Sequence, residues 1–484
     1  MKTTFLLLCL FWLAGCRDIL EETPRANISQ SNFYQSRADI VAGLNAVYSI
    51  MRTFDYYGVT YNAQLEGMTD YCISRGTQAP VSQYQGLDGT NIARTSLIWT
   101  RMYQAINAAN IIVKATPPLN LSDQNALVAE ARFLRALNYF NLVRSFGAVP
   151  IRTEPTETLN QLGGARQPVA TVYGQIVADL LDAEKNLPAT VTEQGRPTSW
   201  AAKTLLAYVY LTTERWADAR DKADEVIQSR AFTLVNVQTP ADFERIFGAG
   251  IGTNSEDVFS LKFARIAGQG WGYPGYFFSA DNPNAPGGVL AHFTQPTLAP
   301  IRNWDTRDLR RDYNLYTSYV NRAGATVNMT AAMPIGFRKY KDPNSLNPGN
   351  NCPILRYPDA LLIYAEAASQ AANGPTALAL ERLNMVRRRA YGFPGTAPSS
   401  VDYALTGQTA ASFRDLVLNE RLYEFVSEMK RWYDLKRLGD DRLKATIKAA
   451  KNIDVATAHL LWPIPVQELA NNPDLKTSDQ NPGY

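Results

Sequence analysis

The chain has 484 residues, of which 46% are hydrophobic and 19% charged, so it can bury a large core in one or two domains. Its 48 basic and 45 acidic residues leave a net charge of +3, which provides no basic field to attract nucleic acid. Only two histidines occur and no cofactor-binding motif is present, so the sequence predicts no metal, no cofactor and no catalytic residue.

The N-terminus has the pattern of a lipoprotein leader. Lys2 precedes an almost wholly apolar run over residues 5–13, which is too short to span a bilayer as a permanent helix. The run ends in the lipobox sequence LAGC, whose cysteine, Cys16, supplies the thiol that is acylated. We expect residues 1–15 to be a signal peptide, Cys16 to be the lipidation site, and residues 17 to about 32 to be a tether. A plain secretory signal with a chance cysteine is the alternative.

Apart from the lipidation site Cys16, the expected mature chain contains two cysteines, Cys72 and Cys352. They could pair in an oxidising compartment, but the sequence does not give their separation. A disulfide between them therefore stays open at this point.

Helical periodicity marks the first large part of the chain and recurs near its end. Apolar stripes predict helices near residues 172–187 and helices beginning near 199 and 216, which are 17 residues apart, half of a 34-residue tetratricopeptide repeat. A second pair is expected at 357–371 and 376–390. The basic run at 387–389 is interpreted as a solvated, ion-paired helix face. We therefore expect a mostly α fold, with a helical-repeat scaffold over 33–235 and 356–440.

The texture changes between residues 236 and 355, where glycine, proline, asparagine and aromatic residues dominate. Compact domains seldom keep so long an irregular stretch unless it is functional. We expect short strands and loops here, and an extended, proline-fixed chain over 441–484.

Several motifs are spread along the chain: AEARFLRALNYFNLVRSFGAVPI at 129–151, then RYPDALLIYAEA, LNMVRRRA, NERLYEFVSEMKRWYDLKRLG and the C-terminal WPIP and NPGY. Together they resemble the SusD/RagB family of nutrient-binding lipoproteins, so residues 16–484 would form one SusD-like domain. The chain departs from the family pattern at Ser427, usually aromatic, and at Met429, usually glycine. The charged residues of this motif, from Glu420 to Arg437, are expected to lock helices together.

The resemblance implies a location and partners. It places the protein on the extracellular side of the outer membrane, anchored through Cys16, beside a TonB-dependent SusC-like transporter. It also implies an oligosaccharide ligand, bound by the loop-rich region 236–355 and by loops that follow the first helices.

Aromatic residues in these loops are the candidate binding residues. The segment 271–278 holds five aromatics in eight residues, and flat rings suit the apolar faces of sugars. Core packing is favoured for Phe277 and Phe278 and is the alternative for the others. The predicted ligand-binding residues are Trp271, Tyr273, Tyr276, Asn303, Trp304, Asp70, Arg75 and Tyr84.

Several functions compete. The leading one is a surface glycan-binding lipoprotein that delivers oligosaccharide to the transporter, with peptide or another nutrient as a variant cargo. A surface-anchored glycoside hydrolase would need two carboxyl groups about 5–10 Å apart, for which Asp281, Asp305 and Asp308 are candidates by region. A helical-repeat scaffold that binds proteins would instead predict that Trp271 and Trp304 are buried.

Overall fold

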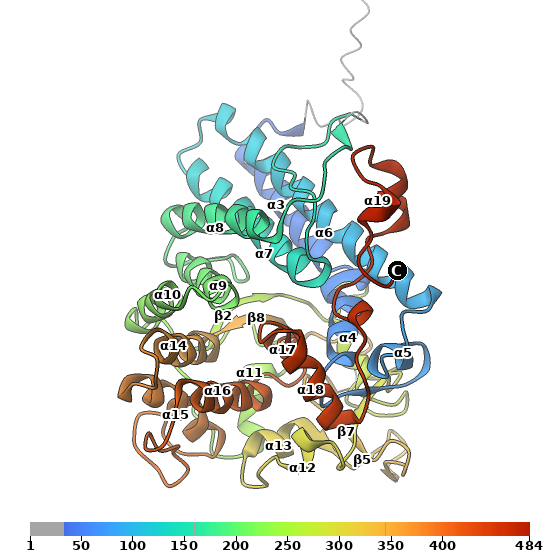
Figure 1. Ribbon diagram of the computed structural model, residues 1–484, viewed down its shortest axis with the longest axis vertical. Helices are drawn as coiled ribbons and strands as arrows, with labels where there is room; N and C mark the ends of the chain where they lie inside the picture. The colour runs from blue at the N-terminus through green and yellow to red at the C-terminus, as the bar shows by residue number, and fades with distance from the viewer. Residues whose placement is uncertain (1–32, 159–160, 344) are drawn as a thin grey trace, which may run out of the picture.

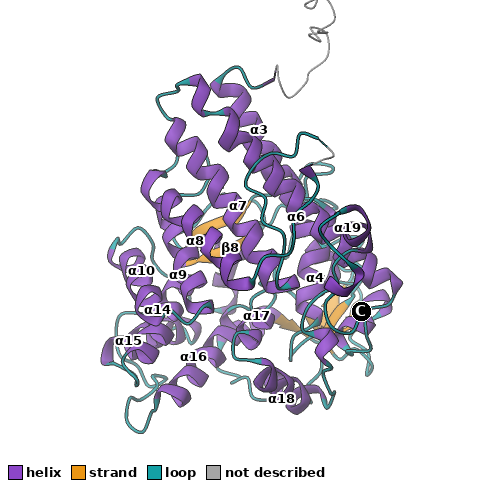
Figure 2. Ribbon diagram, turned by 45° about the horizontal axis from the view of Figure 1, so that its top comes forward, coloured by secondary structure: helices purple, strands orange, loops and turns teal. Residues whose placement is uncertain are grey.

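A computed structural model describes residues 33–158, 161–343 and 345–484. The predicted signal peptide, the lipidation site Cys16 and the tether lie outside these residues. Helices dominate the described chain, and its strands are few and short (Figure 2). Among the described residues no helix is long and apolar enough to cross a membrane.

The first half of the chain is a succession of packed helices, several of which begin at side-chain caps. Ser36 caps α3 by accepting from the Asp39 N–H, and Asp88 caps α6 by accepting from the Asn91 N–H. The helices are α3 (Arg37–Met51), α4 (Thr60–Gly67), α5 (Ala79–Ser82), α6 (Gly89–Ala115), α7 (Gln124–Phe146), α8 (Val169–Asn186), α9 (Ser199–Thr212), α10 (Trp216–Gln228) and α11 (Glu244–Phe247).

The predicted repeat pairs are confirmed. Helices α9 and α10 begin at 199 and 216, and the second pair is α14 (Tyr357–Ala371) and α15 (Ala377–Ala390). Helix α10 packs on α14, and α14 packs on α16 (Ala410–Glu424). Buried alanines such as Ala223 and Ala365 allow this close approach. The helices on both sides of the irregular region therefore form one continuous stack (Figure 1).

The two ends of the irregular region lie side by side where they join the helical stack. Strand β2 (Asp257–Leu261) pairs antiparallel with β8 (Cys352–Arg356), so that Leu261 lies opposite Cys352. Between these ends lie short elements: β3 (His292–Thr294), α12 (Ala299–Arg302), α13 (Leu309–Asn314), β4 (Leu315–Tyr316), β5 (Ser318–Val320), β6 (Thr326–Asn328) and β7 (Ile335–Phe337). Strand β1 (Ile73–Ser74) completes a sheet in the order β1-β3-β7-β4.

The C-terminal segment is only partly extended. Helix α17 (Arg431–Lys436) precedes it, and residues 441–484, which were expected to be extended, instead contain most of α18 (Asp440–Lys451) and all of α19 (Val466–Asn471). Asn481 fixes the last residues by donating to the carbonyls of Phe146 at 2.9 Å and Trp462 at 2.7 Å.

Candidate functional site

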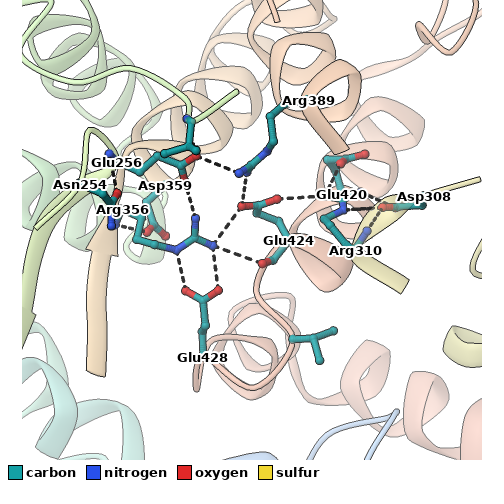
Figure 3. Close-up of polar contacts among 12 residues, drawn as sticks. Asn254, Glu256, Asp308, Arg310, Arg356, Asp359, Arg389, Glu420, Glu424 and Glu428 are labelled. Carbon is teal, nitrogen blue, oxygen red and sulfur yellow. Dashed lines mark hydrogen bonds and ion pairs between the residues drawn. The ribbon is translucent and has the colours of Figure 1, made fainter. Parts of the chain in front are cut away.

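The most conspicuous polar feature is a buried set of ion pairs, which we call the charged core (Figure 3). Arg356, at the end of β8, donates to both carboxylate oxygens of Glu428 at 2.9 and 2.7 Å and to Glu256 at 2.8 Å. Arg389 of α15 bridges Glu256 at 2.8 Å and Glu424 at 2.5 Å. The charged core thus ties both ends of the irregular region to helices α15 and α16. Its members are Glu256, Asp308, Arg310, Lys339, Arg356, Arg389, Glu420, Glu424 and Glu428.

The electrostatics of the charged core fit a structural role, as the sequence predicted. Burial alone would raise the pKa of Glu424, but Arg389 and Arg356 hold it well below its usual range. The same balance, with Arg356 and Lys339 as the cations, lowers the pKa of Glu428. Both carboxylates are therefore ionised at neutral pH and act as ion-pair acceptors rather than proton donors.

The basic run on α15 is ion-paired, but the expectation that it is solvated is wrong for two of its three residues. Arg388 and Arg389 are 1% and 2% exposed. Arg388 pairs with Glu381 at 2.7 Å and Asp402 at 2.6 Å. Arg389 pairs with Glu256 and Glu424, which are 133 and 35 residues away in the sequence, so local periodicity does not reveal its burial.

The unusual residues Ser427 and Met429 keep the backbone bend between α16 and α17. Both have φ of 61°, a left-handed conformation that is uncommon for residues other than glycine. The Ser427 N–H donates to the Tyr71 hydroxyl at 2.9 Å, and the Met429 N–H donates to Glu66 at 2.6 Å. Side chains from the N-terminal helices therefore hold the strained turn in place.

The expected exposure of the aromatic segment is wrong for its two leading residues. Trp271 and Tyr273 are both 0% exposed. The Trp271 ring lies 4.7 Å from that of Tyr340, and its indole N–H donates to the Tyr57 carbonyl at 2.9 Å. The segment 271–278 lies wholly within the described residues and forms no α-helix, as its glycine and proline residues predicted. Its loops nevertheless pack on each other and enclose these rings.

Three further predicted binding residues are also buried. Trp304 is 3% exposed and stacks on Tyr423 of α16 at 4.7 Å between ring centroids. Asp70 forms a two-point pair with Arg431 at 3.0 and 2.6 Å, which uses the carboxylate to hold α17. Tyr84 is 6% exposed and donates its hydroxyl to the Met68 carbonyl. In this structure these side chains support the fold and face no open surface.

The remaining predicted residues, Arg75, Tyr276 and Asn303, are at least partly exposed. The pairing of β1 with β3 brings the loop that contains Arg75 to the irregular region, where residues 289 and 290 connect Arg75 to the segment that contains Tyr276. Arg75 donates to the carbonyls of Leu290 at 2.6 Å and Val289 at 2.7 Å. The Val289 N–H donates to the carbonyl of Gly275, the residue before Tyr276, at 2.8 Å. Asn303 lies elsewhere, at the end of α12.

The surface around Arg75 and Tyr276 also contains two exposed apolar side chains. No pattern in the sequence pointed to either of them. Val289 is 53% exposed and Leu346 is 75% exposed. A β-carbon on Gly287 would lie 4.0 Å from Leu346, so Leu346 lies beside the loop that leads into Val289. We call the surface made by Arg75, Tyr276, Val289 and Leu346 the loop face.

The structure shows the contacts of the two cysteines and of the three candidate acids, of which Asp281 is exposed and accepts a hydrogen bond from the Tyr319 hydroxyl at 2.8 Å. Cys72 and Cys352 are both buried and free, and Cys72 lies 3.2 Å from His292 Nδ1. Asp308 is 1% exposed within the charged core. Hydrogen bonding to Arg307 lowers the pKa of Asp305 to about 2, the opposite of what a general acid needs.

Comparison with known proteins decides the family. The family described as "SusD family" matches residues 271–484, and the family described as "Starch-binding associating with outer membrane" matches residues 20–211. This chain belongs to the SusD family. SusD-like protein P2 of Formosa agariphila is 28% identical to it over 520 residues, which cover 100% of this chain and 99% of that protein.

Solved SusD structures share the fold. A SusD homologue from Bacteroides thetaiotaomicron aligns with a TM-score of 0.81 and 22% identity over 95% of this chain and 99% of its own. A protein described as a laminarin-binding SusD-like protein aligns with a TM-score of 0.73 and 24% identity, covering 93% of this chain and 100% of its own. The SusD-like, mainly helical fold predicted from the sequence is therefore confirmed.

Proposed function

We propose that this SusD-family protein is an outer-membrane lipoprotein that binds an oligosaccharide at its loop face and passes it to a TonB-dependent transporter. The observation that carries the proposal is the loop face itself. It joins a partly exposed tyrosine ring, two exposed apolar side chains and a guanidinium group held in place by two carbonyls. Rings and apolar groups pack on sugar C–H faces, while the polar groups receive hydroxyls.

The family supports the same direction. One matching family is described as starch-binding and associated with the outer membrane, and one structural neighbour is described as binding laminarin. Delivery to a transporter and the extracellular orientation are our extension of this likeness. A peptide or another nutrient in place of the glycan is the alternative cargo.

Binding without catalysis is part of the proposal. Asp308 is engaged in the charged core and Asp305 has a lowered pKa, so neither is suited to protonate a leaving group. A glycan array should identify an oligosaccharide that the mature protein binds, and prolonged incubation should release no reducing ends. Turnover that disappears when Asp281 is replaced by Asn would favour the hydrolase instead.

The partner is tested by co-purification. Extraction of the tagged full-length lipoprotein in mild detergent should co-isolate a large outer-membrane barrel. The interface should exceed the roughly 1,600 Å² of an ordinary complex. Repeated isolation of the lipoprotein alone, under conditions in which such barrels survive, would contradict the transport role.

A protein-binding scaffold is the second candidate, because it predicted the observed burial of Trp271 and Trp304. A pocket of about 670 Å³ between α6 and α19, near the exposed side chains Leu97 and Val466, is a surface that such a partner would use. Loss of barrel co-isolation in Leu97→Asp, with glycan binding retained, would assign partner binding to this groove.

A further inference from the structure

A second pocket, separate from the loop face, carries unbalanced positive charge. It has a volume of about 460 Å³ and lies where α7, α8, α9 and α17 meet the C-terminal segment. Figure 1 shows α17 below α7 near the centre of the view, with α9 to its left. Arg144, Lys436 and Arg437 line it together with a single acidic residue, Asp440.

Within the described ranges 33–158, 161–343 and 345–484, Arg437 is the one of these three cations that forms an ion pair. Arg437 pairs with both carboxylate oxygens of Glu366 and with Asp434 at 3.3 Å. Among the residues that the structure describes, no carboxylate oxygen lies within 4.0 Å of a side-chain nitrogen of Arg144 or Lys436. Arg144 and Lys436 are both partly exposed, and a partly buried charge without a partner attracts a counter-ion from solution.

Four contacts fix the orientation of the Arg144 guanidinium at the pocket. Its guanidinium lies 3.7 Å from the centre of the Phe140 ring and 3.9 Å from that of Tyr433. It also donates to the Phe140 carbonyl at 3.0 Å and to the Asn141 side chain at 2.8 Å. None of these contacts supplies a negative charge, so the group is oriented without being neutralised.

Lys436 is the neighbouring cation. Its ammonium donates to the Arg144 carbonyl in the last turn of α7. Burial lowers the pKa of Lys436 to about 7; repulsion from Arg144 adds to this effect and attraction to Asp440 opposes it.

We propose that this pocket binds an oxyanion, either the carboxylate or sulfate group of an acidic sugar or the free inorganic anion, between Arg144 and Lys436. Tyr173 and Tyr433 give the pocket aromatic walls and Thr457 adds a hydroxyl. This anion site is separate from the loop face, and it does not depend on ligand binding there.

Calorimetry at about pH 6 tests the proposal with sodium glucuronate, sodium sulfate and neutral glucose as probes, in chloride at matched ionic strength. Glucuronate or sulfate should bind and glucose should not. Glucose 6-sulfate is added as the sulfated-sugar probe: tighter binding of glucuronate or of glucose 6-sulfate than of free sulfate identifies an acidic sugar as the ligand, and the reverse identifies an inorganic anion. Lys436→Met keeps the aliphatic stem and should weaken binding at least ~10-fold, because it removes one charge-assisted hydrogen bond.

Two further variants make the test decisive. Lys448→Met removes an exposed lysine of α18 that pairs with Asp454, and should leave anion binding unchanged. Asp440→Asn removes the pocket's acidic residue and should tighten binding, which gives a readout even if Lys436→Met fails to fold. Equal anion binding in Lys436→Met and wild type, or unchanged or weaker binding in Asp440→Asn, would overturn the proposal. Lys436 would then be a cap on the C-terminus of α7.

Discussion

Replacing Arg356 with methionine should lower the free energy of unfolding by about 3 kcal/mol, near the lower end of the range for removing one partner of a buried ion pair. Arg356 is 2% exposed and donates to Glu428 at 2.9 and 2.7 Å and to Glu256 at 2.8 Å. After the change Glu428 keeps Lys339 at 2.6 Å and Glu256 keeps Arg389 at 2.8 Å. The expected loss is moderate because neither carboxylate is left alone.

Equilibrium urea unfolding followed by circular dichroism measures this loss. Arg215→Met is a matched control, since the Arg215–Asp218 pair is 49% exposed on both sides and should contribute less than about 1 kcal/mol. Adding Glu428→Met to Arg356→Met should return part of the stability, because it removes the carboxylate left with fewer partners. If Arg356→Met is no more destabilising than Arg215→Met, the charged core does not hold the irregular region to the helices.

Burial raises the pKa of Glu66 from 4.5 to about 7, so over this pH range the folded protein keeps a proton that the unfolded chain releases. The stability that this proton contributes is fully present below pH 4.5 and is lost as the pH rises to about 7. By urea titration at about pH 5 and about pH 8, Glu66→Gln should lose less stability with rising pH than wild type; equal losses would contradict this. Ser427→Gly should stabilise the protein by about 0.5–1 kcal/mol, because relief of left-handed strain exceeds the entropy cost of glycine; a lower melting temperature would argue against strain at the turn. Cys16→Ala should abolish palmitate labelling and release the protein from the membrane, and labelling that persists would refute lipidation at this residue.

The helical frame was predictable because its signals are local. The 17-residue spacing of α9 and α10, and the small residues on α14 and α15, are visible in the sequence alone. The return of the chain through β2 and β8 was not, because strand pairing between Leu261 and Cys352 depends on contacts far apart in sequence.

The candidate site was predicted at the level of regions but only partly at the level of residues. Glycine and proline around Trp271 indicate loops, and loops suggest exposure, yet the indole finds a buried acceptor in Tyr57, whose position no local pattern gives. Asp70 has the same explanation, because its partner Arg431 is supplied by α17. Val289 and Leu346 carry no motif, and only the folded chain brings Val289 to Arg75 and Leu346 to the neighbouring Gly287.

Ligand binding at the loop face is tested most directly by calorimetry with the oligosaccharide that the array identifies. Tyr276→Ala should weaken binding at least ~30-fold, since truncating a central aromatic contact commonly costs about 2 kcal/mol or more. Tyr484→Ala, at a 37% exposed tyrosine near the C-terminus, should bind like wild type. An unchanged affinity in folded Tyr276→Ala, or an equal loss in Tyr484→Ala, would contradict the assignment of the ligand to the loop face.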